Sequence, residues 1–211
     1  MAAPPSEGLL SYILQKIRER LRRVPPPPPP PPTPPPTPPP TPPPPPTTGT
    51  ITAYTRDEYV TAIKNILNTS TNLILSHIML VEDPSAAGGR GKEMIDALIA
   101  TYKRIAVTGK KGPDILRFSL SAIGPQQSTD LTPVINYFTS NGVPVESIRA
   151  IQSRAKVLLA DPVIDSVGNV TSGTAVIGTN NWTNQSLTAN EEFNIVSTQP
   201  HIADALFKFH N

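Results

Sequence analysis

The chain has no cysteine, and it is poor in histidine, aromatic residues and net charge. Among 211 residues there are three histidines, 5% aromatic residues and 16% charged residues. Without cysteine there can be no disulfide, thiol nucleophile or thiolate metal ligand. The histidines, His77, His201 and His210, show no metal-ligand spacing. We therefore expect no metal and no cofactor.

Long hydrophobic runs are also missing. No stretch is apolar for the roughly 20 residues that a membrane-spanning helix needs. The first residues lack the pattern of a secretory signal peptide. These two observations predict an intracellular or virion protein.

The charge balance excludes a globally basic nucleic-acid-binding domain. Of the 18 basic and 16 acidic residues, five and two precede residue 50, which leaves 13 and 14 in the remainder. Any affinity of the remainder for nucleic acid must therefore come from a local patch or from the basic N-terminal segment.

Proline, in contrast, is abundant and concentrated. Residues 25–46 contain only proline and three threonines, Thr33, Thr37 and Thr41. Proline has no amide hydrogen and a fixed φ, so this stretch is predicted to extend as polyproline II. At about 3.1 Å per residue it would span roughly 70 Å. We interpret residues 25–49 as a polyproline II rod that acts as a spacer.

Residues 1–24, before the rod, are predicted to form a basic amphipathic helix that Ser6 can cap. Its apolar stripe has no adjacent core of its own to cover, which predicts docking on another surface. A protein partner or self-association ranks first, nucleic acid second and a membrane third. The predicted docking residues are Leu9, Ile13, Leu14, Ile17 and Leu21.

Residues 50–211 show alternating helical and strand patterns. Hydrophobic periodicity predicts an α/β fold with a mixed sheet. The expected helices are 57–67, 93–102, 131–141 and 203–209. The expected strands are 72–81, 115–123, a short one near Val143, 156–161 and 174–177. Gly168-Asn169 is predicted to turn a hairpin between the last two strands.

Three short motifs follow in the second half of this region. Arg154-Ala-Lys156 is followed by Asp161, then by Gly178-Thr179-Asn180-Asn181, and then by Asn190-Glu191-Glu192. The series resembles the phospholipase D superfamily signature H-x-K-x4-D, G-S-x-N, N-x-E, in a single copy. Where that family has its nucleophilic histidine, this sequence has Arg154.

The resemblance implies a phospholipase D-like α-β-α sandwich and a site for a phosphodiester. In the family, the histidine attacks phosphorus, while the lysine and asparagine neutralise the phosphate oxygens. A guanidinium stays protonated and has no free lone pair, so Arg154 cannot form the covalent intermediate. The expected phosphate-binding residues are Arg154, Lys156, Thr179, Asn181, Asn190 and Glu192. Single-motif members pair two subunits, so the resemblance also implies a homodimer through the C-terminal domain.

Two functions follow from these residues. The first is a catalytically impaired phospholipase D-like protein that serves as a structural or nucleic-acid-backbone-binding module in an assembly, such as a virion or nucleoprotein. The alternative is an active nuclease or phosphodiesterase with a non-standard nucleophile, for which His77 is the substitute. A scaffold without any ligand is a third interpretation.

Overall fold

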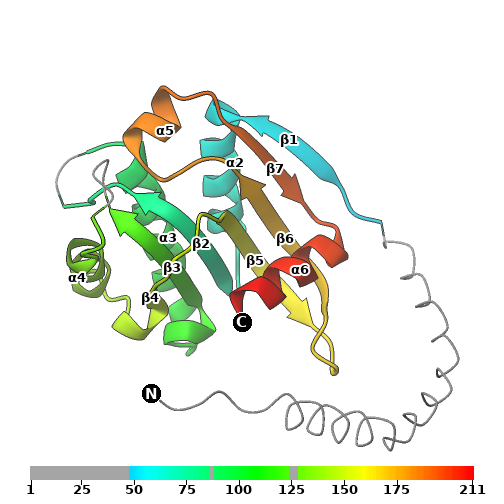
Figure 1. Ribbon diagram of the computed structural model, residues 1–211. Coiled ribbons are helices and arrows are strands. Elements are labelled where there is room, and N and C mark those ends of the chain that lie inside the picture. The colour runs from blue at the N-terminus through cyan, green and yellow to red at the C-terminus, as the bar shows by residue number, and fades with distance from the viewer. Residues whose placement is uncertain (1–47, 86–87, 124–127) are drawn as a thin grey trace, which may run out of the picture. The chain divides into compact units, whose positions relative to one another are not determined.

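The computed structural model describes residues 48–85, 88–123 and 128–211, which fold around a seven-stranded mixed sheet (Figure 1). The strand order is β1-β7-β6-β5-β2-β3-β4. Strands β2, β3 and β4 are parallel, and all the other neighbours are antiparallel. The strands are β1 (Ile51–Thr55), β2 (Ile74–Val81), β3 (Leu116–Ile123), β4 (Ile148–Ala150), β5 (Lys156–Ile164), β6 (Val170–Gly178) and β7 (Phe193–Ser197). The predicted docking helix and residues 25–47 of the predicted rod lie outside the described residues.

Helices cover both faces of the sheet, and this arrangement confirms the predicted α/β architecture with a mixed sheet. One face packs against α2 (Arg56–Thr69), α3 (Arg90–Ala106) and α4 (Thr132–Ser140) in the main hydrophobic core. The C-terminal helix α6 (Pro200–His210) lies on the opposite face, over β5, β6 and β2, and encloses a second, smaller core (Figure 1). The short helix α5 (Asn184–Thr188) contacts α2 and α3.

Trp182 anchors the segment between β6 and α5 in the main core. Its side chain is fully buried, stacks 5.8 Å from the ring of Phe118, and donates a hydrogen bond from Nε1 to the Tyr59 hydroxyl at 3.2 Å. Its backbone bridges to the end of β2 through bonds with Leu80 and Glu82. The chain after β6 is therefore held across the top of β5 and fixed beside β2.

Strand direction brings the predicted motifs to one edge of the sheet. β5 runs antiparallel to both β2 and β6, with Lys156 paired to Ile78 and Val157 paired to Ile177. The first residue of β5 therefore lies at the same edge as the last residues of β2 and β6. The predicted hairpin turn is present at the far end, where Gly168 adopts a φ of 90° that favours glycine.

Three details differ from the sequence-based expectation. Val143 is buried but lies before a short 3-10 helix (Val145–Ser147), and the strand there is β4, which begins at Ile148. Strands β1 and β7 were not predicted. Every residue of β1 is at least partly exposed, and β7 buries Asn194 and Ser197, so neither segment shows the usual apolar alternation.

Candidate phosphodiester-binding site

The motif residues gather around Glu192, whose carboxylate is held by three side chains. Thr179 Oγ1 donates to Glu192 Oε2, while Ser186 Oγ donates to Oε1. Asn190 Nδ2 lies 3.4 Å from the same Oε1. Because these groups come from three separate segments, the carboxylate ties the end of β6, helix α5 and the start of β7 together.

Lys156 occupies the start of β5 in a half-buried position. Its Nζ donates to the Arg154 carbonyl at 3.1 Å and lies 3.7 Å from the Met79 sulfur. Burial lowers the pKa of Lys156, the Glu192 charge partly opposes this, and Arg154 adds to the lowering. No ion pair formed within the described residues includes Lys156. Its charge is therefore only partly compensated.

Arg154 projects from the loop before β5 and is exposed. No ion pair or side-chain hydrogen bond connects its guanidinium to another described residue. The side chain lines a hollow of about 330 Å³ on the β2–β3 side of Lys156, with Met79, Ser121, Ala122, Thr129, Gln152 and Ser153. On the β7–β1 side, Thr55, Arg56, Asp57, Asn190, Glu191 and Glu192 line a hollow of about 250 Å³. One hollow thus borders Arg154 and the other borders Asn190 and Glu192.

Asn181 belongs to the loop that closes the site. Its backbone N–H donates to Ser186 Oγ at 3.0 Å, and its buried Oδ1 has no hydrogen-bond partner among the described residues. The structure therefore brings Arg154, Lys156, Thr179, Asn181, Asn190 and Glu192 to one edge of the sheet.

Asn194 and Ser186 are site residues that the sequence analysis missed. Asn194 is fully buried, and a Cβ added to Gly178 would lie 1.8 Å from its Oδ1. Glycine is therefore required at position 178 by the close approach of Asn194 on the neighbouring strand. The apolar pattern of β7 does not mark Asn194, because its burial depends on the pairing of β7 with β6.

Asp161 lies away from the other motif residues. It is five residues along β5 from Lys156, or roughly 16 Å at about 3.3 Å per residue. Its carboxylate accepts hydrogen bonds from the backbone N–H groups of Thr71 and Asn72, at 3.0 and 2.8 Å, and its φ of 51° lies in the left-handed region. Asp161 thus fixes the connection between α2 and β2.

His77 packs beneath α6. Its ring centroid lies 4.9 Å from that of Phe209 and 4.0 Å from that of His210. Its ring nitrogens have no hydrogen-bond partner among the described residues, and burial lowers its pKa to about 4, with Arg149 adding to the effect. No contact links its imidazole to the Glu192 network.

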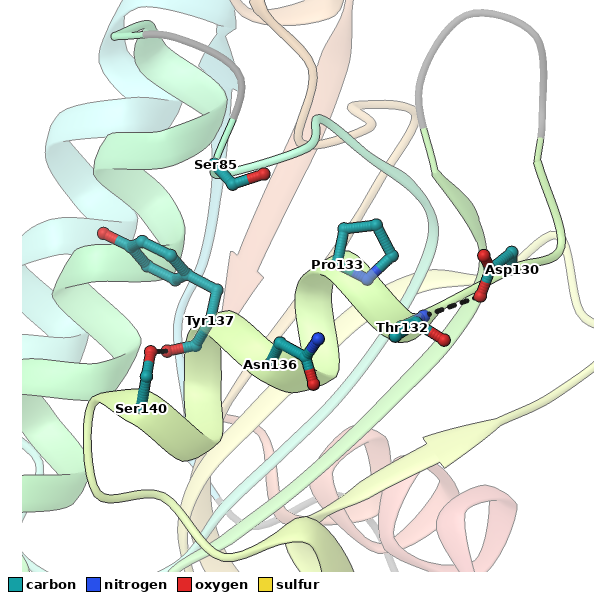
Figure 2. A pocket seen from close by; sticks show the side chains of 7 residues that line it. All are labelled: Ser85, Asp130, Thr132, Pro133, Asn136, Tyr137 and Ser140. Carbon is teal, nitrogen blue, oxygen red and sulfur yellow. Dashed lines mark hydrogen bonds between the residues drawn. The ribbon is translucent and has the colours of Figure 1, made fainter.

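A larger hollow, of about 500 Å³, lies along α4 and contains no motif residue (Figure 2). Figure 2 shows Asp130 and Thr132 at its rim, where the Thr132 N–H donates to Asp130 at 3.0 Å. The described residues contain no group of three or more side chains arranged to bind a metal ion. None of their helices has the length and apolarity needed to cross a bilayer.

Comparison with known proteins places the fold. No protein-family model and no curated protein matches this sequence. The phospholipase D family member Nuc from Salmonella typhimurium superposes with a TM-score of 0.50 and 17% identity, over 77% of this chain and 91% of that one. NucT from Helicobacter pylori gives a TM-score of 0.52 and 9% identity, over 77% and 94%.

The fold is phospholipase D-like. A phosphatidylserine synthase from Haemophilus influenzae gives a TM-score of 0.54 and 12% identity, over 75% of this chain and 35% of that one. These identities are low, so the likeness concerns the fold alone, and the chemistry must be argued from the residues of this chain.

Proposed function

We propose that residues 50–211 form a phospholipase D-like domain that binds a phosphodiester backbone and has lost covalent catalysis. The observation that carries the proposal is the pairing of two cations at one edge of the sheet, Arg154 exposed and Lys156 half-buried, without a carboxylate in ion-pair contact among the described residues. A phosphodiester would supply the missing negative charge.

The electrostatics of Lys156 favour an anion. Burial disfavours its charged form, and an arriving phosphate would reverse this effect by adding an opposite charge at short range. Arg154 can add a bidentate contact, because a planar guanidinium matches two phosphate oxygens. Its exposure at the edge of a 330 Å³ hollow leaves space for that contact.

The loss of covalent catalysis follows from the chemistry of position 154. A guanidinium offers no lone pair to phosphorus, and a phosphoryl-enzyme intermediate would need one. The alternative, an active phosphodiesterase that uses His77, would require a route from beneath α6 to the edge that carries Lys156. The packing of His77 against Phe209 and His210 favours the binding function.

Binding can be tested by fluorescence anisotropy with a labelled single-stranded oligonucleotide. We expect Arg154→Gln and Lys156→Ala each to weaken binding several-fold and to reduce the salt slope by about 0.7 per lost phosphate contact. Lys64→Ala is the matched control, because Lys64 is a cation on α2 that pairs with Glu93. Equal affinity in all four proteins would refute the proposed site.

Catalysis is tested separately with the same oligonucleotide and a chromogenic phosphodiester. We expect no turnover in the unmodified protein. Turnover that Lys156→Ala abolishes would instead establish the active alternative, and His77→Phe would then identify or exclude His77 as the substitute nucleophile. Arg154→His tests whether restoring an imidazole at this position restores hydrolysis.

We further propose a homodimer through this domain, supported by an apolar strip on the outer strands. Ile51, Ala53 and Phe193 lie on one face of the β1–β7 pair, and Ile51 and Phe193 are 52% and 61% exposed. Phe193 directly follows Glu192, so the strip borders the site. A two-fold interface would bury the same strip on both subunits.

Sedimentation of residues 48–211 tests the homodimer. We expect a dimer at tens of micromolar and a monomer for Phe193→Glu. Val167→Glu is the control, since Val167 is 78% exposed at the β5–β6 turn, away from the strip. A monomeric unmodified domain would contradict the proposal.

The N-terminal segment completes the proposal as a tether. Its support is the sequence alone. Residues 1–24 are basic and carry an apolar stripe, and 22 residues of proline and threonine precede the domain. Such a segment would hold the domain at a distance from an assembly, for example a virion or nucleoprotein. Leu14→Asp with Ile17→Asp is expected to abolish co-sedimentation with that assembly and to leave oligonucleotide binding by the domain unchanged.

A further inference from the structure

The C-terminal helix α6 closes over a pair of buried histidines that the phosphodiester site does not use. His77 on β2 is 6% exposed and His210 in the last turn of α6 is 3% exposed. Their ring centroids are 4.0 Å apart at an interplanar angle of 64°. All four ring nitrogens lack a hydrogen-bond partner among the described residues. The pair therefore packs as two neutral aromatic rings.

The charged groups around the pair are cationic. From β4, the Arg149 guanidinium donates to the His210 carbonyl at 3.1 Å, and from β3, Arg117 donates to Asn211 Oδ1 at 2.7 Å. The residues paired with His77 on the adjacent strands are Val157 and Ser119, neither of which ionises in this range.

The acid of α6 itself is already engaged. Asp204 accepts from Lys208 Nζ at 2.7 Å and from the Val170 N–H at 3.0 Å. Lys208 is the remaining charged side chain in the last turns of the helix, and it is a further cation. Among the described side chains that face the pair, none offers a carboxylate that could compensate an imidazolium.

The surroundings of the two histidines lower their pKa values while α6 is docked. Burial, followed by Arg149, lowers the pKa of His77 to about 4. Burial, His77 itself and the two arginines lower the pKa of His210 to about 3. In a released helix both groups would return toward 6.5, the ordinary value. The released form therefore binds more protons below about pH 6.5, and acid favours release.

We infer that the His77–His210 pair makes the docking of α6 acid-sensitive, so that lowering the pH releases the C-terminal turns of the helix from the sheet. At neutral pH both rings are uncharged and pack together. Protonation of either ring puts a charge into a site that holds another imidazole and two guanidinium groups.

Release would expose an apolar face of the sheet. Ala203 and Leu206 of α6 cover a small core with Leu75, Val157, Leu159, Val170 and Ala175. Ile74 and Ile78 of β2 pack in the main core on the other face, whereas His77, two residues after Leu75, lies on the α6 face. Acid is thus expected to open this face before the α2–α3 face unfolds.

Hydrogen exchange of the full chain between pH 7.5 and 4.5, corrected for intrinsic rates, tests the inference. We expect amide protection in residues 203–210 to fall by at least about tenfold at pH 5, while protection in α3 persists. His77→Phe with His210→Phe keeps two buried aromatic rings and should keep α6 protected. His201→Phe changes an exposed histidine of the same helix and should behave like the unmodified protein.

A second measurement keeps the inference falsifiable if the double variant does not fold. In the unmodified protein, the ring C–H resonances of His77 and His210 should remain in their neutral positions until α6 loses protection. Titration of both rings near pH 6.5 with α6 still protected would overturn the inference. So would equal loss of α6 protection in the unmodified protein and a folded double variant.

Discussion

The motif edge of the sheet and the sheet face beneath α6 treat charge in opposite ways. At the motif edge, the charges of Arg154 and Lys156 are incompletely compensated, and Arg154 lines an open hollow. Under α6, His77 and His210 are kept neutral by burial and by two nearby arginines. The first arrangement suits the proposed binding of an anion, whereas the second disfavours protonation. Arginine therefore has two roles here: Arg154 is available for a ligand, and Arg149 is committed to the backbone of α6.

The largest expected effect on stability is at Gly178, where β6 and β7 pack closely at the motif edge. Gly178→Ala would place a Cβ 1.8 Å from the buried Asn194 amide, so strand β6 or β7 must shift. We expect a loss of about 3 kcal/mol in the free energy of unfolding, measured by urea denaturation. Gly88→Ala is the control, because an added Cβ there meets no atom within 4 Å. A stable Gly178→Ala variant would show that Asn194 can leave the site.

Asp161 is the motif residue that we expect to affect stability and not phosphodiester binding. Asp161→Ala removes the acceptor for the Thr71 and Asn72 N–H groups, which should cost about 2 kcal/mol of stability. Oligonucleotide affinity should not change, because Asp161 lies roughly 16 Å along β5 from Lys156. Asp114→Ala, at an exposed acid outside the motif, is the control for stability. Loss of affinity in folded Asp161→Ala would place Asp161 in the binding function.

The smallest effects compare the two arginines directly. Arg154→Gln should change the free energy of unfolding by less than about 0.5 kcal/mol, since its guanidinium has no partner among the described residues. Arg149→Gln should cost about 1 kcal/mol through its lost bond to the His210 carbonyl. It should also raise the pKa of both buried histidines, which Arg149 lowers. Urea denaturation measures the change in stability, and histidine titration by NMR measures the change in pKa. Identical behaviour of the two variants would contradict the different roles given to Arg154 and Arg149.

The sequence predicted the elements that bury a regular apolar pattern. Helices α2, α3, α4 and α6 and strands β2, β3, β5 and β6 were all expected, with boundaries that differ by a few residues. Strand β1 could not be predicted because it has no buried residue, and its strand conformation depends on pairing with β7, about 140 positions away. A short strand was expected near Val143, but Pro144 follows it and pairing begins only at Ile148.

The sequence named candidate residues for the site, but it did not show which other residues pack against them. The resemblance of the motifs with Lys156, Thr179 and Glu192 to the phospholipase D signature implied a shared site, and strand direction explains why they meet. The burial of Asn194 against Gly178 depends on the register between β6 and β7, which a single sequence does not specify. The position of His77 beneath α6 likewise depends on where the last helix packs.

The position of β1 at the rim of the sheet has a mechanical consequence. This strand joins the N-terminal segment to the domain, and its described attachments include the β7 ladder from Ile51↔Ser197 to Thr55↔Phe193 and backbone bonds between Thr50 and Thr198. Tension on residues 1–47 would load these bonds first. The central strands, with the motif edge and α6, would be shielded until β1 detached. In a tethered protein, β1 would therefore be the element that yields first under force.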